Sequence, residues 1–326
     1  HMRRVTPSSK LRGVSLSKST PADIRGIALP MARAAIDRAG DLRLDAAKLS
    51  ELWESAAILH FSSGKFHYND GLTFFSATQI AEKLNGGDYT TGEKFFLGFD
   101  GTTAYFAWCT EDVNPANPNA QNPAMTLTPD TSAKAKDENP DFKSLRAIGD
   151  DLTDAEMGLA VHTQALANWH HTHTFCSRCG ATTSSANGGS LRKCDADASE
   201  HYPRTDPAII VLVKDKEDRV LLGRQKVWPE HRFSNFAGFV EPGESFENCV
   251  TREVMEEAGV ELTQINYLGS QPWPFPASLM IAFEAVTNTP QIAKADGDEI
   301  EEIRWFSRAE MKAAILDKSL ILPLEI

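Results

Sequence analysis

The stretch GFVEPGESFENCVTREVMEEAGV runs from Gly238 to Val260 and concentrates acidic residues in a chain of otherwise ordinary composition. Within it, Glu253, Glu256 and Glu257 fall inside five residues. Like charges at this density repel one another. The crowding therefore needs either a solvated surface or a bound positive charge, and the spacing of the residues decides between the two.

A helix is predicted from Phe246 to Ala258. Ser245 is a suitable N-cap residue because its hydroxyl can accept from a free backbone amide of the first turn. Gly259 can take the left-handed conformation that ends many helices. A buried stripe is expected from apolar residues that recur every fourth position, namely Phe246, Val250, Val254 and Ala258. On such a helix, Glu253 and Glu257 lie one turn apart on one face.

Carboxylates gathered in this way suit hard divalent cations, since Mg2+ binds oxygen ligands and shares its shell with substrate phosphates. The spacing matches the signature of the Nudix hydrolases at every defined position. The matching residues are Gly238, Glu244, Arg252, Glu253, Val254, Glu256, Glu257, Gly259 and Val260. The stretch therefore resembles the catalytic segment of that family, and a merely solvated acidic face becomes the weaker interpretation.

The resemblance implies a metal-dependent hydrolase that cleaves a nucleoside diphosphate linked to another group. Family ligands for Mg2+ or Mn2+ correspond to Glu253, Glu257, Glu299 and the carbonyl of Ala237, with Glu256 as a further ligand or a supporting neighbour. Arg252 and Glu244 complete the expected catalytic residues. The proton of the attacking water would pass to Glu256 or Glu257, and the sequence does not decide between them.

A second motif addresses the substrate. It consists of Gln271, Pro272, Trp273, Pro274, Phe275, Pro276, Ala277 and Ser278. Three prolines in eight residues exclude a central strand, and aromatic rings on a stiff backbone offer a stacking surface for a flat base. An apolar loop packed on the core, or a proline-rich ligand for another protein, is the alternative interpretation.

This motif, preceded by Ser270, resembles the array that marks the NAD(H) pyrophosphatase branch of the Nudix family. The segment from Tyr202 to Pro207 and the helix containing Trp169 resemble that branch as well. The branch implies cleavage of NAD(H) to AMP and nicotinamide mononucleotide, and some members remove NAD caps from RNA 5′ ends. Tyr202, Phe239 and the array would line the substrate pocket. Active members are homodimers, so a homodimer is expected.

Two other functions stay open at this point. A Nudix domain can be kept as a non-catalytic sensor of NAD or another nucleotide, although a degraded signature or an added DNA-binding domain would be expected. A Nudix pyrophosphatase for ADP-ribose or another nucleoside diphosphate derivative is the alternative if the proline array misleads.

The five cysteines suggest a metal site rather than a disulfide framework, because their number is odd and three of them cluster. Cys176 and Cys179 form half of a zinc ribbon, but only Cys194 is present in the other half. Asp197 stands at the spacing of the fourth ligand, and His201 is the other candidate. A water molecule could also complete the site, or the site could have lost zinc. Bound Zn2+ would be structural.

The net charge of −12 argues against general affinity for DNA, RNA or anionic membranes. No apolar run is long enough to predict a membrane span. His1 and Met2 look like a cloning remnant. A cytoplasmic, intracellular location is expected, and a peroxisomal one stays open because a truncated C-terminus would hide such a signal.

The predicted fold class is α+β, with no internal repeat visible in the sequence. Residues 1–112 are expected to form a β-rich N-terminal domain for folding or dimerisation, and 113–150 a linker loop. Residues 151–205 are expected to hold a helix, from about Asp154 to Trp169 behind a Thr153–Glu156 capping box, and the zinc-ribbon-like segment. The resemblance predicts a Nudix α/β/α sandwich with a mixed sheet over residues 206–326.

Overall fold

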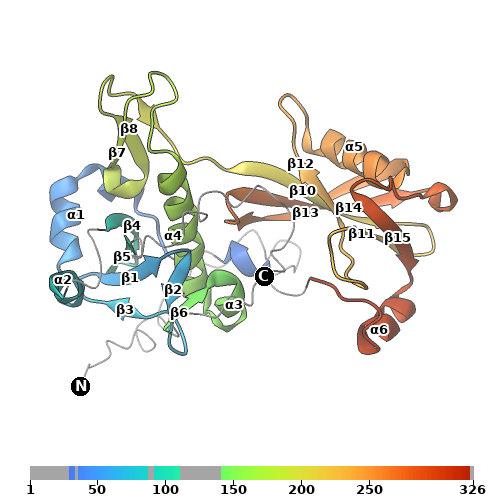
Figure 1. Ribbon diagram of the computed structural model, residues 1–326, viewed down its shortest axis with the longest axis horizontal. Helices are drawn as coiled ribbons and strands as arrows, with labels where there is room; N and C mark the ends of the chain where they lie inside the picture. Colours follow the sequence, from blue (N-terminus) through green and yellow to red (C-terminus); the bar gives the residue numbers. More distant parts are fainter. Residues whose placement is uncertain (1–28, 34–35, 87–91, 111–140, 324–326) are drawn as a thin grey trace. The chain divides into compact units, whose positions relative to one another are not determined.

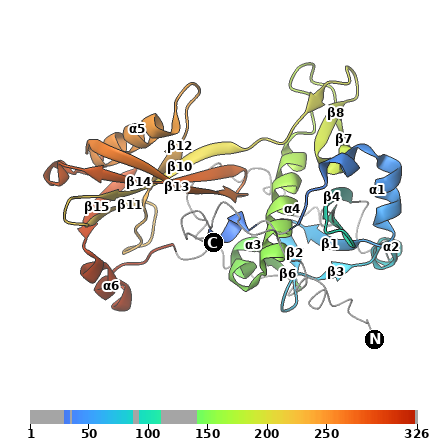
Figure 2. The same cartoon turned by 180° about the vertical axis from the view of Figure 1, so that it is seen from behind.

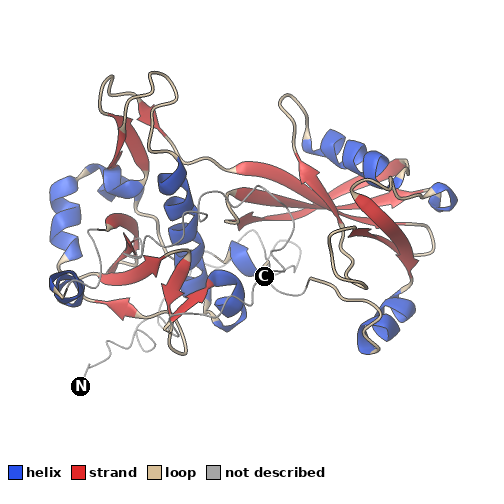
Figure 3. Ribbon diagram, viewed as in Figure 1, coloured by secondary structure: helices blue, strands red, loops and turns tan. Residues whose placement is uncertain are grey.

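The computed structural model describes residues 29–33, 36–86, 92–110 and 141–323, and Figure 3 distinguishes their helices and strands. The chain divides into two compact units. Among the described residues, the first unit contains 30–204 and 274–277, and the second contains 29, 205–273 and 278–323. Each unit is built on its own sheet.

The first unit contains a six-stranded sheet in the order β4-β5-β1-β2-β6, with β3 paired to β1. Its strands are β1 (Ala57–Ser62), β2 (Lys65–His67), β3 (Phe74–Phe75), β4 (Glu93–Phe99), β5 (Ala104–Thr110) and β6 (Phe142–Ser144). Its helical segments are η4 (Pro30–Ala32), η5 (Gly40–Leu44), α1 (Ala46–Trp53), α2 (Ala77–Asn85), α3 (Leu145–Ile148), η6 (Gly149–Asp151) and α4 (Asp154–Thr172). Only the β1–β5 pair is parallel among the described pairs of this sheet.

Aromatic side chains fill the core of the first unit. Trp53 of α1 meets the ring of Phe106 edge to face at 5.3 Å, and Phe96 packs on the same ring. Helix α4 lies beside strands β4 and β5 (Figures 1 and 2). The predicted capping box of Thr153 and Glu156 is confirmed, since each side chain bonds the backbone amide of the other residue.

Part of the expected linker is folded. Of the expected linker, residues 113–140 lie outside the described residues. Strand β6 and helix α3 occupy 142–148, inside the range expected to be a loop. They form because Phe142, Leu145 and Ile148 are all buried, and burying apolar side chains stabilises regular structure there.

A three-stranded antiparallel sheet follows α4 within the first unit. It contains β7 (Thr183–Ala186), the turn η7 (Asn187–Gly189), β8 (Leu191–Cys194) and β9 (Glu200–His201). The turn lies so close to β4 that a Cβ atom at Gly189 would overlap the ring of Phe95. His170 of α4 is buried and bonds the Gly189 carbonyl at 2.8 Å. This contact helps to extend the helix beyond the expected end at Trp169.

The second unit contains a six-stranded sheet in the order β13-β14-β10-β11-β15, with β12 paired to β10. Its strands are β10 (Asp206–Lys214), β11 (Val220–Gln225), β12 (Phe236–Phe239), β13 (Leu262–Trp273), β14 (Ser278–Thr287) and β15 (Ile300–Phe306). Its helical segments are α5 (Phe246–Ala258), η8 (Pro290–Ile292) and α6 (Arg308–Leu316). The β10–β14 pair is parallel and the other described pairs are antiparallel.

The two longer helices of the second unit pack against opposite faces of its sheet, with α5 and α6 on different sides in Figure 1. Leu221 of β11 belongs to the core cluster under α5, and the next residue, Leu222, belongs to the cluster under α6. Neighbouring residues of a strand point to opposite faces. The expected α/β/α sandwich with a mixed sheet is therefore confirmed.

Helix α5 has the predicted bounds and the predicted ends. Ser245 accepts from the Asn248 amide, and Gly259 has a φ of 65°. The predicted apolar stripe was wrong at Phe246, which is 41% exposed. A four-residue repeat drifts by about 40° per step on a helix of 3.6 residues per turn, so Phe246 points about 80° away from Val254 and lies in the less protected first turn.

The two six-stranded sheets share one topology, which corrects the expectation that the chain has no internal repeat. The first runs β1-β2-β3-α2-β4-β5-β6 and the second runs β10-β11-β12-α5-β13-β14-β15. Their strand orders and parallel pairs correspond one to one. The repeat is invisible in the sequence because backbone pairing tolerates the exchange of aromatic for aliphatic side chains. Among the described helices, none is long and apolar enough to cross a membrane.

Candidate functional site

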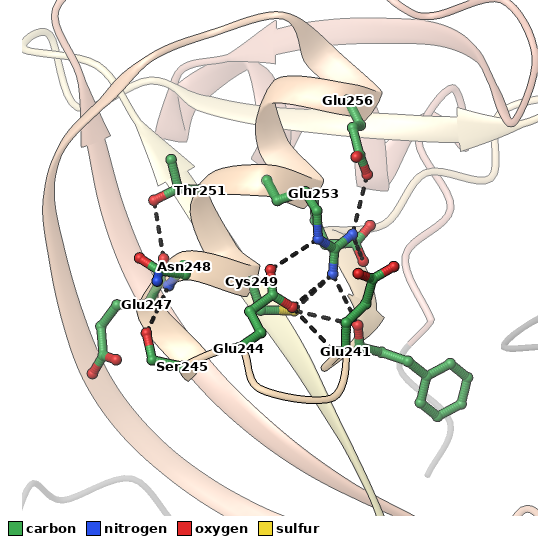
Figure 4. A network of polar contacts seen from close by, with 11 residues as sticks. Glu241, Glu244, Ser245, Glu247, Asn248, Cys249, Thr251, Glu253 and Glu256 are labelled. Carbon is green, nitrogen blue, oxygen red and sulfur yellow. Dashed lines mark hydrogen bonds and ion pairs between the residues drawn. The ribbon is translucent and has the colours of Figure 1, made fainter.

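Arg252 organises the acidic residues of helix α5. Its guanidinium bonds both oxygens of Glu244, at 2.9 Å each, and one oxygen of Glu253 at 2.7 Å. Glu256 accepts a further bond at 3.1 Å. Figure 4 shows these three carboxylates converging from the loop and the helix. Arg252 also donates to the carbonyl of Phe239 at 3.0 Å, so one side chain ties together the strand, the loop and the helix.

These contacts keep the carboxylate of Glu244 charged. The two-pronged bond from Arg252 lowers the pKa of Glu244 to about 2, and the same bond is the first cause of the raised pKa of Arg252. Paired guanidinium and carboxylate groups of this geometry form strong hydrogen bonds. Glu244 and Arg252 therefore hold the loop against the helix. Their predicted catalytic role stays a prediction.

Glu257 lies outside the reach of Arg252. Its side chain is 5% exposed, and its Oε2 atom is buried without a hydrogen-bond partner. Burial raises the pKa of Glu257 to about 9, with further contributions from the carboxylates of Glu299 and Glu253. Within the part of the chain that the structure describes, no cation pairs with Glu257. A buried carboxyl among acids is stabilised as a carboxylate by a bound metal ion.

Gly238 leaves room for one of the predicted ligands. It lies on β12, and a Cβ atom built on it would overlap the carboxylate of Glu253. The neighbouring Ala237 pairs with Ile210 of β10. A glycine is therefore required so that the Glu253 side chain can reach the backbone of this strand. The metal-ligand role of the Ala237 carbonyl stays a prediction.

Glu299 precedes strand β15 and belongs to the same acidic centre, because its charge contributes to the raised pKa of Glu257. Its Oε1 atom accepts a bond from the side-chain amide of Gln225 at 3.1 Å. Asp296 receives backbone amides from the loop that carries Glu299. Gln225 and Asp296 are not among the site residues predicted from the sequence. An Asp-Gly pair ahead of a strand signals a turn, but no sequence signal identified Gln225.

The proline-rich array is divided between the two units. Gln271, Pro272 and Trp273 end the edge strand β13, whose pairing with β14 continues to Ser278. An edge strand tolerates proline because one side of it needs no hydrogen bonds to a neighbouring strand. This position agrees with the prediction that the array does not form a central strand.

The four residues from Pro274 to Ala277 belong to the first unit. There, the side-chain amide of Asn168 donates to the carbonyls of Pro274 and Pro276 at 3.0 and 2.9 Å. The guanidinium of Arg146 lies 4.0 Å from the ring centre of Phe275.

Two further residues were predicted to line the pocket. Tyr202 belongs to the first unit, is 65% exposed, and donates its hydroxyl to Glu200 at 2.7 Å. Phe239 belongs to the second unit, at the end of β12 beside the acidic helix. The pocket-lining roles of both residues stay predictions.

A second candidate metal site lies in the first unit. The ligand atoms of Cys176, Cys179, Cys194 and Asp197 all lie within 4.8 Å of one another. Backbone amides of Ala196 and Asp197 approach the Cys194 sulfur at 3.4 Å. All five cysteines are free. Among the described residues this is the one such group found, and His201 is not in it. The imidazole of His201 instead contacts the Ser199 hydroxyl at 3.3 Å.

Family comparisons cover nearly all of the described chain. Residues 204–322 match the NUDIX domain, residues 171–202 match the NADH pyrophosphatase zinc ribbon domain, and residues 46–169 match the NADH pyrophosphatase-like rudimentary NUDIX domain. The chain is 37% identical over 288 residues to a protein of Mycobacterium bovis (strain BCG / Pasteur 1173P2) named NAD-capped RNA hydrolase NudC, covering 87% of this chain and 84% of that protein.

The chain belongs to the NADH pyrophosphatase branch of the Nudix hydrolases.

Two other similarities cover less of the chain. NAD-capped RNA hydrolase NUDT12 of Macaca fascicularis is 40% identical over 169 residues, which is 49% of this chain and 36% of that protein. A crystal structure of a NUDIX hydrolase from Nitrosomonas europaea is 24% identical, with a TM-score of 0.37, covering 42% of this chain and 79% of that one.

For this Nudix chain, the two clusters suit different metals. The acidic centre offers only oxygen atoms, which Mg2+ and Mn2+ prefer. The cluster around Cys176 offers three sulfur atoms and one carboxylate, a donor set that suits Zn2+. Hydrogen bonds from Ser199 lower the pKa of Asp197 to about 2, so this carboxylate is charged at neutral pH and available as a ligand.

Proposed function

We propose that this chain hydrolyses the diphosphate of NAD(H) to AMP and nicotinamide mononucleotide, and that the same chemistry removes NAD caps from RNA 5′ ends. The observation that carries the proposal is the buried carboxyl of Glu257, which has no cation within the described chain although it lies among other carboxylates. Relatives named as NAD-capped RNA hydrolases and the NADH pyrophosphatase domains support the substrate class.

In the proposed reaction, Glu253, Glu257 and Glu299 hold the divalent cations, with the carbonyl of Ala237 as a further ligand. Bound Mg2+ or Mn2+ would supply charge stabilisation for the phosphates and a lowered pKa for the attacking water. We place the proton acceptor at Glu256, because its side chain is 59% exposed and open to water. The buried Glu257 is better suited to the metal.

The proposed binding of the dinucleotide uses the aromatic array. We propose that Trp273 and Phe275 stack with a base, and such stacking contributes about 1–3 kcal/mol per base. Prolines on either side restrict the backbone and reduce the entropy lost on binding. Phe239 and Tyr202 are proposed as further contacts. We also propose a homodimer, which light scattering on the full chain would test.

The test compares NADH, NAD+, ADP-ribose and an NAD-capped RNA as substrates, with Mg2+ or Mn2+, for the wild type and Glu257→Gln. Release of AMP and nicotinamide mononucleotide from NADH, lost in the variant, is the expected result. Faster cleavage of ADP-ribose than of every NAD substrate would overturn the substrate assignment. Tight binding of NAD without cleavage would instead identify a nucleotide sensor.

We further propose that the ribbon holds one structural Zn2+ through Cys176, Cys179, Cys194 and Asp197. The compact grouping of their ligand atoms supports this ligand set, and His201 is left to its contact with Ser199. Zinc content measured by mass spectrometry after purification tests the proposal. A protein without zinc, or one that needs His201 to retain it, would contradict this ligand set.

A further inference from the structure

Glu299, Glu301 and Glu302 lie where the chain enters strand β15. Of these three, only Glu299 has no ion pair with a basic side chain among the described residues. Arg224 bonds Glu301 and also Glu302, at 2.5 and 3.4 Å. Among the described residues, no cation pairs with Glu299, which accepts only the neutral amide of Gln225 at 3.1 Å. Arg224 is thus shared by two of the carboxylates, and Glu299 is left without a cation partner in the described chain.

Strand pairing explains how Gln225 reaches this carboxylate. Along β11 and β15, Arg224 pairs with Glu302, whereas the next residue, Gln225, pairs with Ile300. Glu301 is the extra residue of a bulge, which bends a strand and re-aims nearby side chains. The bulge thus sets Gln225 beside Glu299, at the last position of its own strand.

Asp296 fixes the backbone on the other side of Glu299. Its Oδ1 atom accepts the amides of Asp298 and Ile300 at 3.2 and 2.8 Å, and its Oδ2 atom accepts the amide of Glu299 at 3.3 Å. Gly297 closes the loop, with a φ of 81° and a bond to the Ile300 carbonyl. One carboxylate therefore holds three amides of the segment that presents Glu299.

We propose that Asp296 and Gln225 are positioning residues for the metal ligand Glu299: Asp296 fixes its backbone and Gln225 orients its carboxylate toward the acidic centre. The inference rests on the proposed metal-dependent function. Neither residue touches the metal or the substrate. Groups that support a metal ligand commonly change metal affinity by 10- to 100-fold when removed.

The experiment measures Mn2+ binding alone, by the electron paramagnetic resonance signal of free Mn2+, on the full chain with its zinc retained. Asp296→Ala should weaken Mn2+ binding by about 10-fold or more. Asp296→Asn keeps the Oδ1 acceptor and loses one amide bond, so it should weaken binding by only about threefold. Gln225→Leu should fall between these two variants.

The control is Asp298→Ala, which removes an exposed carboxylate from the same loop and should leave Mn2+ binding unchanged. Equal binding by Asp296→Ala and the wild type would overturn the inference. So would an Asp296→Asn variant as weak as Asp296→Ala, because that result would make Asp296 a metal ligand itself. Thermal unfolding before Mn2+ addition checks that each variant is folded, and a misfolded Asp296→Ala leaves the decision to Asp296→Asn and Gln225→Leu.

Failure of the proposed function has a different signature. If Glu257→Gln binds Mn2+ as the wild type does, or if the wild type binds none, the proposed metal centre is wrong and the inference falls with it. If Glu257→Gln abolishes binding while Asp296 and Gln225 variants bind normally, only the positioning role fails. NADH kinetics give a second readout, since a positioning defect should raise the Mn2+ requirement while leaving the KM for NADH near its wild-type value.

Discussion

The two six-stranded sheets have one topology and different chemistry. Each has a helix that begins with a serine N-cap, Ser76 for α2 and Ser245 for α5. Eight residues after the cap, α2 has Leu84 where α5 has Glu253. Helix α2 ends at Asn85, before the positions that correspond to Glu256 and Glu257.

Leu84 packs against the aromatic core of the first unit. The comparison teaches that a fold persists when its chemistry is lost. A few side chains on one helix separate the sheet with the signature residues from the sheet without them.

The strongest test of this comparison removes one carboxylate from each helix. Glu257→Gln should lower the kcat for NADH by about a thousandfold, because a proposed metal ligand and its charge stabilisation are lost. Glu82→Gln, which changes the one glutamate of α2, should leave kcat unchanged. Steady-state hydrolysis with Mn2+ measures both. A large loss in the Glu82 variant would show that the first unit also contributes to catalysis.

A second test shows whether the two proposed metal sites bind their ions independently. Asp197→Ala should weaken zinc binding by at least about 10-fold, the lower bound for losing a mere supporting residue, while the cysteines remain and water can replace the carboxylate. His201→Ala is the matched control and should retain zinc. Zinc release to a chelator measures the effect, while Mn2+ binding at the acidic centre should not change. Equal zinc loss in both variants would contradict the choice of Asp197.

A third test concerns packing under the catalytic helix. Val254 is fully buried, so Val254→Ala should lower the free energy of unfolding of the second unit by about 2 kcal/mol. Phe246 is exposed, and Phe246→Ala should cost less than about 1 kcal/mol. Urea unfolding of both variants measures the difference. A larger cost at Phe246 would restore the four-residue stripe that the structure rejects.

A fourth test distinguishes the two cores by their response to acid. His60 lies in the first unit, stacked on Trp108, and burial followed by the charges of Lys83 and His67 lowers its pKa to about 3. An unfolded histidine has a pKa near 6.5. Because the folded pKa is depressed, the stability is complete above pH 6.5 and is lost as the pH falls from 6.5 toward 3.

His60→Phe should therefore reduce the slope of the free energy of unfolding against pH, by about 1.4 kcal/mol per pH unit between pH 6.5 and pH 3. Urea unfolding followed by hydrogen exchange of peptides from β1 and β5 measures the first unit separately. A variant with the wild-type slope would show that His60 does not control acid sensitivity.

Most of the second unit could be predicted from the sequence because its information is local. Helix α5 and its caps follow from spacing within 23 residues, from Gly238 to Val260. Gln225 and Asp296 could not be predicted, because their roles depend on a strand bulge and on backbone amides that no side-chain pattern reports. The choice between Asp197 and His201 depended on where the chain turns after Cys194. The repeated topology escaped detection because pairing is a property of the backbone.

Gly238 helps to interpret the sequences of relatives of this chain. A single added carbon at this position would collide with the carboxylate of Glu253, while the strand that carries it could still pair with its neighbour. One substitution could thus displace the Glu253 carboxylate and leave the strand in place. A residue other than glycine at this site would therefore mark a relative whose Glu253 counterpart lies elsewhere, even where all of the glutamates survive.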